Sequence, residues 1–382
     1  MSVWGGLFAL LAAIYLAECA AWVRRNSVVF RALVRKGWQV LHPLEWTGNE
    51  SGGLATAGPL PPLAPLIHCH LWPVSLSEEG VFAYAAQALR DVGRPRQTAR
   101  FLKWEQVTEV RLQGKRVLVN GEPLIETGSP VFADRVAGVV EELSELPPER
   151  RGKAIRSALR EAMDERAIRE RMESFREQTL SLRFTCNLFF LVIFGLVPTM
   201  LLQPALLQRW PFFLAAVLAL LAMVLLDYRR AHRALYPDAK GQRRAHFWMI
   251  LFSPLAAIRA RDVVARDLLA NYSPLAVAHV ICRPDSFRRF ARERLADLRW
   301  PMLPVCESDD EDARRTEEAF RGVLLEESER FLRHAGLDPD ALSAPPERDG
   351  NASAAYCPRC DAQYAVADAS CEACGGLPVT RF

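Results

Sequence analysis

Two stretches without any charged residue place the strongest constraint on how this chain can fold. They cover residues 184–208 and 210–226, and only Arg209 separates them. A bilayer accepts about 20 consecutive apolar residues as one spanning helix. The sequence therefore predicts a membrane protein, although its mean hydropathy of +0.01 and net charge of +3 are those of an ordinary soluble chain.

Three transmembrane helices are expected. The second and third are residues 186–202 and 211–226, and their short connector favours an antiparallel hairpin with Pro211 opening the last helix. The first is residues 2–23, which as a helix would be about 33 Å long and would cross a hydrocarbon core of about 30 Å. A cleaved signal peptide is the alternative for this segment, but no Lys or Arg precedes its apolar run.

Basic residues follow the first and the third expected span. The first flank belongs to residues 24–65, a basic and linker segment, and the other flank holds six Lys and Arg residues between positions 229 and 244. Because positively charged flanks remain in the cytoplasm, they predict a multi-pass protein of the cell (cytoplasmic) membrane, with its N-terminus outside and its C-terminus in the cytoplasm. Glu18 is the only charged residue in the expected spans, so we interpret them as anchors.

Residues 66–146 show the period-two alternation of β-strands and then the pattern of one amphipathic helix. Asn120-Gly121 between two apolar runs predicts a hairpin, and Ser129 predicts the helix cap. The tryptophan-containing segment 101–110, the hairpin and the final helix resemble pleckstrin-homology-like (PH-like) domains of bacterial membrane proteins. This resemblance implies a small β-barrel or sandwich that binds protein or lipid at the membrane surface.

Residues 149–183 are rich in both charges and repeat apolar residues every three to five positions, which predicts one long amphipathic helix. Two interpretations stay open. The helix is either solvated and packed on its own module, or it is a coiled-coil stalk through which the protein forms a homodimer.

Residues 227–337 predict an α-helical cytoplasmic module, which a linker over residues 338–354 separates from the C-terminus. The uncharged stretches 245–258 and 268–282 are shorter than a spanning helix requires. We expect them to be buried helices, with interfacial or re-entrant segments as the alternative. The acidic run 307–312 is interpreted as a solvated linker or the start of a helix.

Two Cys-x-x-Cys pairs in residues 355–382 are the strongest chemical signal. The predicted metal ligands are Cys357, Cys360, Cys371 and Cys374. Four thiolates suit a tetrahedral ion, and a segment this short needs the ion in order to fold. The Cys-Pro-x-Cys and Cys-x-x-Cys-Gly-Gly patterns resemble a zinc ribbon, which implies one structural zinc per chain; iron has the same ligand set and is the less favoured metal.

The sequence contains no motif of a phosphate-binding loop, a serine hydrolase, a zinc protease or a dinucleotide site. We therefore expect a non-enzymatic, membrane-anchored binding, scaffolding or regulatory protein that contacts membrane lipid and a protein partner at the cytoplasmic face. One alternative is a membrane enzyme or transporter accessory subunit with a site among His68, His70, His279 and acidic groups. For the His68 and His70 pair itself, we favour a role in strand pairing or at the surface over metal binding.

Contact with nucleic acid or the ribosome through the zinc ribbon is the other alternative. The ribbon offers Arg359 and Arg381 as cations against three acidic residues. Binding to a phosphate backbone requires an excess of positive charge, so the sequence disfavours nucleic acid as a partner.

Overall fold

The computed structural model describes residues 28–31, 39–41, 67–83, 100–196, 199, 203, 209–301, 310–350 and 352–382. The expected first span at residues 2–23 lies outside the described residues. So do most of the segment 24–65, most of the connector before the third span, and the first half of the acidic run, residues 307–309.

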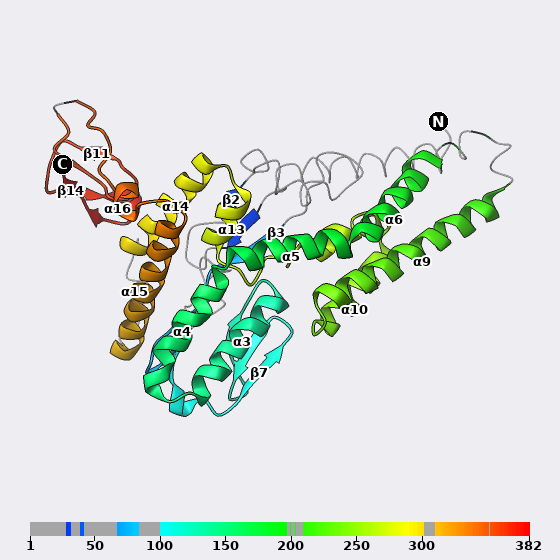
Figure 1. Ribbon diagram of the computed structural model, residues 1–382, viewed down its shortest axis with the longest axis horizontal. Helices are drawn as coiled ribbons and strands as arrows, with labels where there is room; N and C mark the ends of the chain where they lie inside the picture. The colour runs from blue at the N-terminus through cyan, green and yellow to red at the C-terminus, as the bar shows by residue number, and fades with distance from the viewer. Residues whose placement is uncertain are drawn as a thin grey trace.

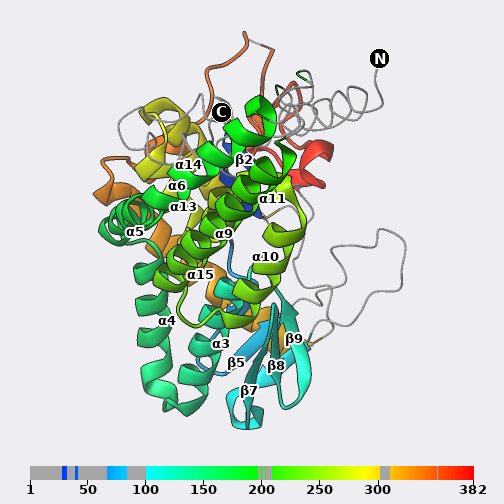
Figure 2. The same cartoon turned by 90° about the vertical axis from the view of Figure 1, so that its right-hand side faces the viewer.

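Two three-stranded antiparallel sheets and a helix occupy most of the range 66–146 (Figure 2). The first sheet has the order β4-β5-β6 and the second the order β7-β8-β9. A 3-10 turn, Trp104–Gln106, joins them, and α3 packs against β7 and β8. The elements are β4 Val74–Leu76, β5 Gly80–Ala83, β6 Arg100–Lys103, β7 Val110–Gln113, β8 Arg116–Val119, β9 Glu122–Glu126 and α3 Pro130–Glu145.

Local sequence signals set the turns of this region. Asn120 and Gly121 have φ angles of 54° and 81°, the left-handed values that a two-residue hairpin turn requires. The Asn120 side chain also accepts hydrogen bonds from the backbone N–H groups of Thr108 and Glu109, which secures the start of β7. Ser129 caps α3 by accepting a hydrogen bond from the Phe132 N–H.

A third sheet lies earlier in the chain, partly inside the segment expected to be a basic flank and linker. Its order is β2-β1-β3, and β3 pairs in parallel with β1. The strands are β1 Val28–Arg31, β2 Gln39–Leu41 and β3 Ile67–His70.

Residues 149–183 form parts of three helices rather than one. α4 covers Pro148–Ala162, α5 covers Glu165–Gln178, and α6 covers Leu180–Leu191. Asp164 ends the continuity because its carboxylate caps α5 by accepting from the Ala167 N–H. The apolar stripe is buried within the same chain: its α4 part faces the two β-sheets, and its α5 part joins the core around α9.

One helix in the described part of the chain, Pro211–Leu235, is long and apolar enough by itself to cross a membrane. It is most of α9, Trp210–Leu235, and α6 packs along it (Figure 1). α5 and residues 180–195 satisfy the same test only as a pair, with a bend of 50° between them.

The expectation of three transmembrane helices is therefore not supported. The stretch 186–202 continues α6 only to Leu191 and then through a π-helical turn, Val192–Leu196, while most of the residues beyond it lie outside the described chain. The stretch 211–226 is the first part of α9, which runs on for nine more residues into charged sequence.

Further helices follow α9, and several of them begin at a proline. They are α10 Lys240–Phe252, α11 Pro254–Ile258, α12 Ala260–Ala265, α13 Pro274–Ile281, α14 Pro284–Arg299, α15 Glu311–His334 and α16 Pro339–Leu342. The stretch 268–282 is almost entirely buried, whereas the stretch 245–258 leaves three large side chains of α10 exposed.

The β-rich region comprises the two antiparallel sheets and α3, within residues 66–146. Its core is completed by helices from elsewhere in the chain. Trp104 is 1% exposed, and its indole N–H donates to the Ser77 carbonyl oxygen at 2.9 Å. Ile155 of α4 and Phe320 of α15 belong to the same apolar cluster. The β-rich region therefore depends on α4, which follows it directly, and on α15, which lies more than 160 residues further along the chain.

We predict that Trp104→Ala destabilises this region by about 3–5 kcal/mol, because it opens a large cavity and leaves the Ser77 carbonyl without its donor. Pulse proteolysis of the full chain in detergent, with cleavage followed between residues 67 and 146, measures the loss. Leu112→Ala is the control, since the Leu112 side chain is 41% exposed. Equal resistance of the two variants would contradict the prediction.

Candidate metal centre

The four C-terminal cysteines lie in two short hairpins. Cys357 and Cys360 occupy the turn between β10 and β11, and Cys371 and Cys374 surround the turn between β12 and β13. A last strand, β14, pairs with β10 to give the sheet order β11-β10-β14. The strands are β10 Ala355–Tyr356, β11 Gln363–Tyr364, β12 Ser370–Cys371, β13 Leu377–Pro378 and β14 Thr380–Arg381.

In both turns a residue with a positive φ angle directly follows the second cysteine. Asp361 and Gly375 stand at these equivalent positions with φ angles of 60° and 73°. Glycine adopts this left-handed conformation without cost, and Asp is among the few other residues that tolerate it. The Asp361 N–H donates to the Cys357 carbonyl and the Gly376 N–H to the Cys371 carbonyl, each at 2.9 Å.

The two turns bring all four predicted ligands together. Their sulfur atoms lie within 4.8 Å of one another, and the Sγ atoms of Cys360 and Cys371 are 3.6 Å apart. Sulfurs bound at about 2.3 Å to a tetrahedral zinc are separated by about 3.8 Å, so the cluster fits such an ion. Three of the cysteines are buried and Cys360 is exposed, while Tyr364 and Leu377 pack against the group.

The thiols differ in how readily they ionise. Burial opposes ionisation of Cys371, but hydrogen bonds from Tyr364, Cys360 and Cys357 outweigh it and lower the pKa of Cys371 to about 7. Burial raises the pKa of the Cys374 thiol, and hydrogen bonds with the neighbouring thiols raise it further. A cation would replace the remaining protons, so metal affinity should rise with pH. This donor set is compatible with a structural metal such as zinc.

The first turn also fastens the metal centre to α14. Arg359, whose side chain is 7% exposed, forms an ion pair with Asp297 and donates to the Trp300 carbonyl. Asp361 forms a second ion pair, with Arg292. Arg359 and Asp361 flank Cys360. The same turn therefore positions the cysteine ligands and docks on α14.

This docking changes the role of a residue that the sequence presents as a cation for nucleic acid. Arg359 is buried against α14, and Arg381 forms an exposed pair with Asp368 at 3.1 Å. The sequence did not predict Asp297 as the partner of Arg359, because the two residues are 62 positions apart. The sequence shows only that Arg359 lies inside a Cys-x-x-Cys turn, and an arginine in such a turn can be exposed as well as buried.

The histidines considered as an alternative site are not assembled into one. His68 and His70 are buried on β3 with ring centroids 6.3 Å apart, and His70 stacks on Phe132. His279 pairs with Glu165 at 2.8 Å. Across the described ranges, the four cysteines are the only group of three or more His, Cys, Asp or Glu side chains close enough to share an ion.

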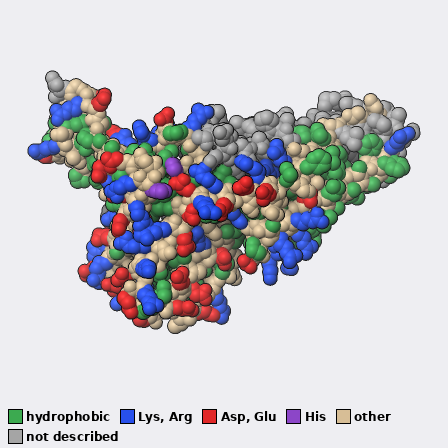
Figure 3. Space-filling view, in the orientation of Figure 1, with side chains coloured by type: hydrophobic (Ala, Val, Ile, Leu, Met, Phe, Trp, Pro, Cys, Tyr) green, Lys and Arg blue, Asp and Glu red, His purple; other side chains and the backbone are tan. Residues whose placement is uncertain are grey.

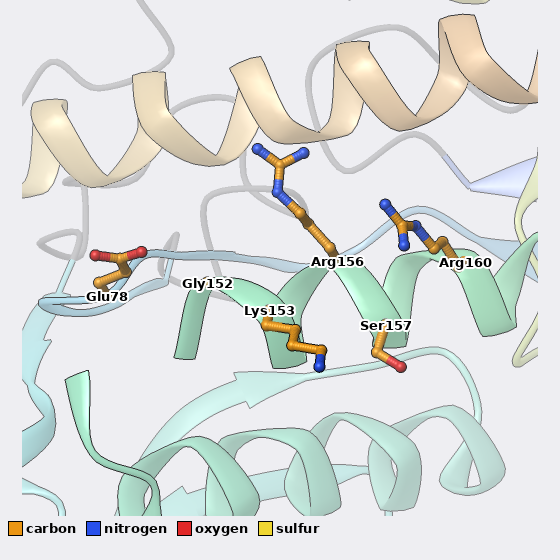
Figure 4. Close-up of a pocket in the computed structure, with 6 residues that line it drawn as sticks. All are labelled: Glu78, Gly152, Lys153, Arg156, Ser157 and Arg160. Carbon is orange, nitrogen blue, oxygen red and sulfur yellow. The ribbon is translucent and has the colours of Figure 1, made fainter. Parts of the chain in front are cut away.

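A cavity of about 420 Å³ beside α4 also lacks a convergent set of reactive groups (Figure 4). Arg156 extends toward α15, where it meets Glu326 at 2.6 Å, while Lys153 and Ser157 point the opposite way. Arg160 is engaged by Glu327 at 3.0 Å. The lining residues are Glu78, Gly152, Lys153, Arg156, Ser157 and Arg160.

No protein-family model matches the chain, and no curated protein or solved structure is significantly similar to it. The resemblance of residues 66–146 to PH-like domains therefore has no support from a matched family. What the structure establishes there is a pair of three-stranded sheets followed by a helix.

We predict that the purified full chain holds about one divalent metal ion and that Cys374→Ser reduces this to roughly none, since three thiolates leave a tetrahedral site incomplete. Metal analysis by mass spectrometry after dialysis measures the content. Cys282→Ala is the matched control, because Cys282 is a buried cysteine outside the cluster. Unchanged metal in the Cys374 variant would contradict the assignment.

We predict that Arg359→Ala releases the four-cysteine segment, residues 355–382, from α14 while leaving the metal bound. Losing the ion pair and the bond to the Trp300 carbonyl should cost about 1–3 kcal/mol, seen as faster amide hydrogen exchange in α14 and in the first turn. Arg381→Ala removes an exposed pair and should cost less than about 1 kcal/mol. Indistinguishable exchange in the two variants, or loss of metal from Arg359→Ala, would refute the docking role.

Proposed function

We propose that this chain is a membrane-anchored, non-enzymatic binding or scaffolding protein. In this proposal α9 and α6 hold it in the cell membrane, and its C-terminus faces the cytoplasm. The β-rich region acts as a PH-like binding module, and the C-terminal four-cysteine domain is a zinc ribbon that contacts a protein partner.

The observation that carries the proposal is the placement of two chemically different ends. The apolar pair α6 and α9 and the four-cysteine domain lie at opposite ends of the structure, with the β-rich region and the other helices between them (Figure 1). Hydrophobic side chains gather over the α6 and α9 end, and charged side chains cover the middle (Figure 3). Anchoring the apolar end would keep the four-cysteine domain away from the bilayer and accessible to a partner.

The chemistry of the four-cysteine site favours a structural over a catalytic role. Four thiolates complete a tetrahedral shell, so the ion would keep no open position for water or substrate. The ion would instead hold the two hairpins in one conformation and so preserve the surface that they form. Exposed Val366 and the second turn, residues 372–376, lie on this surface and are free of the contacts that dock the first turn on α14.

Crosslinking in native membranes tests the proposal. The full chain and the variant Cys371→Ser/Cys374→Ser are compared, and we expect at least one protein crosslinked to the first to be lost from the second, because the ribbon surface unfolds without metal. Both chains must remain in the membrane pellet after carbonate washing. Cys282→Ala controls for the loss of a cysteine. An identical set of crosslinked proteins in all three would refute a ribbon-mediated partner, and release by carbonate would refute the anchor.

A further inference from the structure

Helix α10 carries large apolar side chains on the surface where a helix of a water-soluble module would carry polar ones. Phe252 is 77% exposed and Trp248 is 50% exposed, and their rings stack with centroids 5.8 Å apart. Met249 is exposed beside them, whereas Ile250 faces inward and is fully buried. The C-terminal half of α10 is thus apolar on both its inner and its outer side, unlike an ordinary surface helix.

The contacts between α10 and α9 show which part of α9 lies beside the exposed apolar residues of α10. The Tyr228 hydroxyl donates to the Arg243 carbonyl at 3.4 Å, and the rings of His232 and His246 are 6.1 Å apart. The two helices follow one another through a short turn, so α10 runs back along α9. At about 1.5 Å per residue, position 250 lies about 6 Å beyond His246, at the level of α9 where its apolar part ends.

The exposed apolar residues of the two helices therefore lie at the same level. Leu226 and Met223 of α9 are 56% and 46% exposed, and they are the last exposed large apolar residues before Asp227 begins the charged part of the helix. Trp248 and Phe252 add exposed apolar side chains at this level, on a helix that packs against α9. Aromatic residues at this level are typical of the interface between hydrocarbon and headgroups.

A border of exposed cations lies on the side of this surface away from the bilayer. The residues are Arg229, Arg230, Arg233, Lys240 and Arg244. The acidic residues of the same stretch are Asp227, which lies 4.0 Å from Arg230, and the exposed Asp238, so the five cations keep an excess of positive charge. Positive charge within a Debye length of an anionic leaflet is attracted to its headgroups.

We propose that the C-terminal half of α10, residues 247–252, is an interfacial segment that lies among the headgroups of an anionic bilayer beside the cytoplasmic end of α9. The inference rests on the proposed function, because it requires α9 to be in the membrane. It adds to the proposed function a second lipid contact, made by residues 247–252 with anionic lipid. It also favours the interfacial alternative for the stretch 245–258.

Photocrosslinking of the full chain in vesicles of phosphatidylcholine mixed with phosphatidylglycerol tests the proposal. The photoreactive residue p-benzoylphenylalanine is placed at one of three exposed positions, and adducts are identified by mass spectrometry. Position 252 reports on α10, position 218 on the apolar part of α9, and position 366 on the four-cysteine domain. We expect lipid adducts at 252 and 218 and none at 366.

The pattern of adducts distinguishes failure of the interfacial role of α10 from failure of the α9 anchor. Lipid at 218 but not at 252 would overturn the interfacial role of α10 and leave the anchor intact, whereas no lipid at 218 would overturn both. An adduct between position 252 and a second copy of the chain would show that this surface contacts another protomer instead of lipid, and would also overturn the inference.

The lipid identity tests the role of the cations. We expect phosphatidylglycerol to be enriched about threefold or more among adducts at 252, relative to its share of the bilayer, and not among adducts at 218. Arg229→Gln/Arg244→Gln should reduce this enrichment without abolishing lipid contact at 252. Proportions at 252 that match the bulk bilayer would overturn the preference for anionic lipid.

Discussion

A buried carboxylate on α15 fixes the geometry on which the rest of the structure depends. The Glu327 side chain is fully buried and meets Arg156 and Arg160 of α4 at 3.5 and 3.0 Å, together with Arg330 of its own helix. A carboxylate can be removed from water only when it is paired and hydrogen-bonded. The pairs specify one position of α15 on α4, and α15 in that position contributes Phe320 to the core of the β-rich region.

A continuous series of contacts then runs from α15 to the metal centre. Arg299 of α14 pairs with Glu329 of α15 at 2.6 Å. Asp297, two residues earlier in α14, holds Arg359 in the first metal turn. The position of the four-cysteine domain is therefore coupled through two helices to the β-rich region, even though the described part of residues 338–354 contains only one short helix, α16.

The features that could be predicted from the sequence are those that a few adjacent residues determine. Asn120-Gly121 forms its hairpin, Ser129 caps its helix, and the two Cys-x-x-Cys pairs meet, because local backbone geometry is sufficient in each case. The contacts of Glu327 and Arg359 could not be predicted, since each partner lies far away in the chain.

Hydropathy gave a less reliable prediction than these local signals. It measures how apolar a stretch is and not whether the backbone continues as one helix. The stretch from residue 186 is apolar enough for a span, yet its helical segment, residues 180–195, passes the length test only together with α5, and the two are bent by 50°. Asp164 similarly divides the expected helix 149–183, because a capping carboxylate stabilises a helix start more than it favours continuation.

The polar contacts at the base of α6 and α9 limit how deeply the helix pair can enter a bilayer. Ser181 of α6 donates to the Asp227 carboxylate at 2.8 Å, and this bond joins the helices where the exposed apolar residues of α9 end. Hydrocarbon would strip water from the exposed Arg229 and Arg230 next to it, which is costly for ions. In the proposed membrane arrangement the bilayer boundary would therefore fall near Leu226, the same level that the contacts with α10 assign to Trp248 and Phe252.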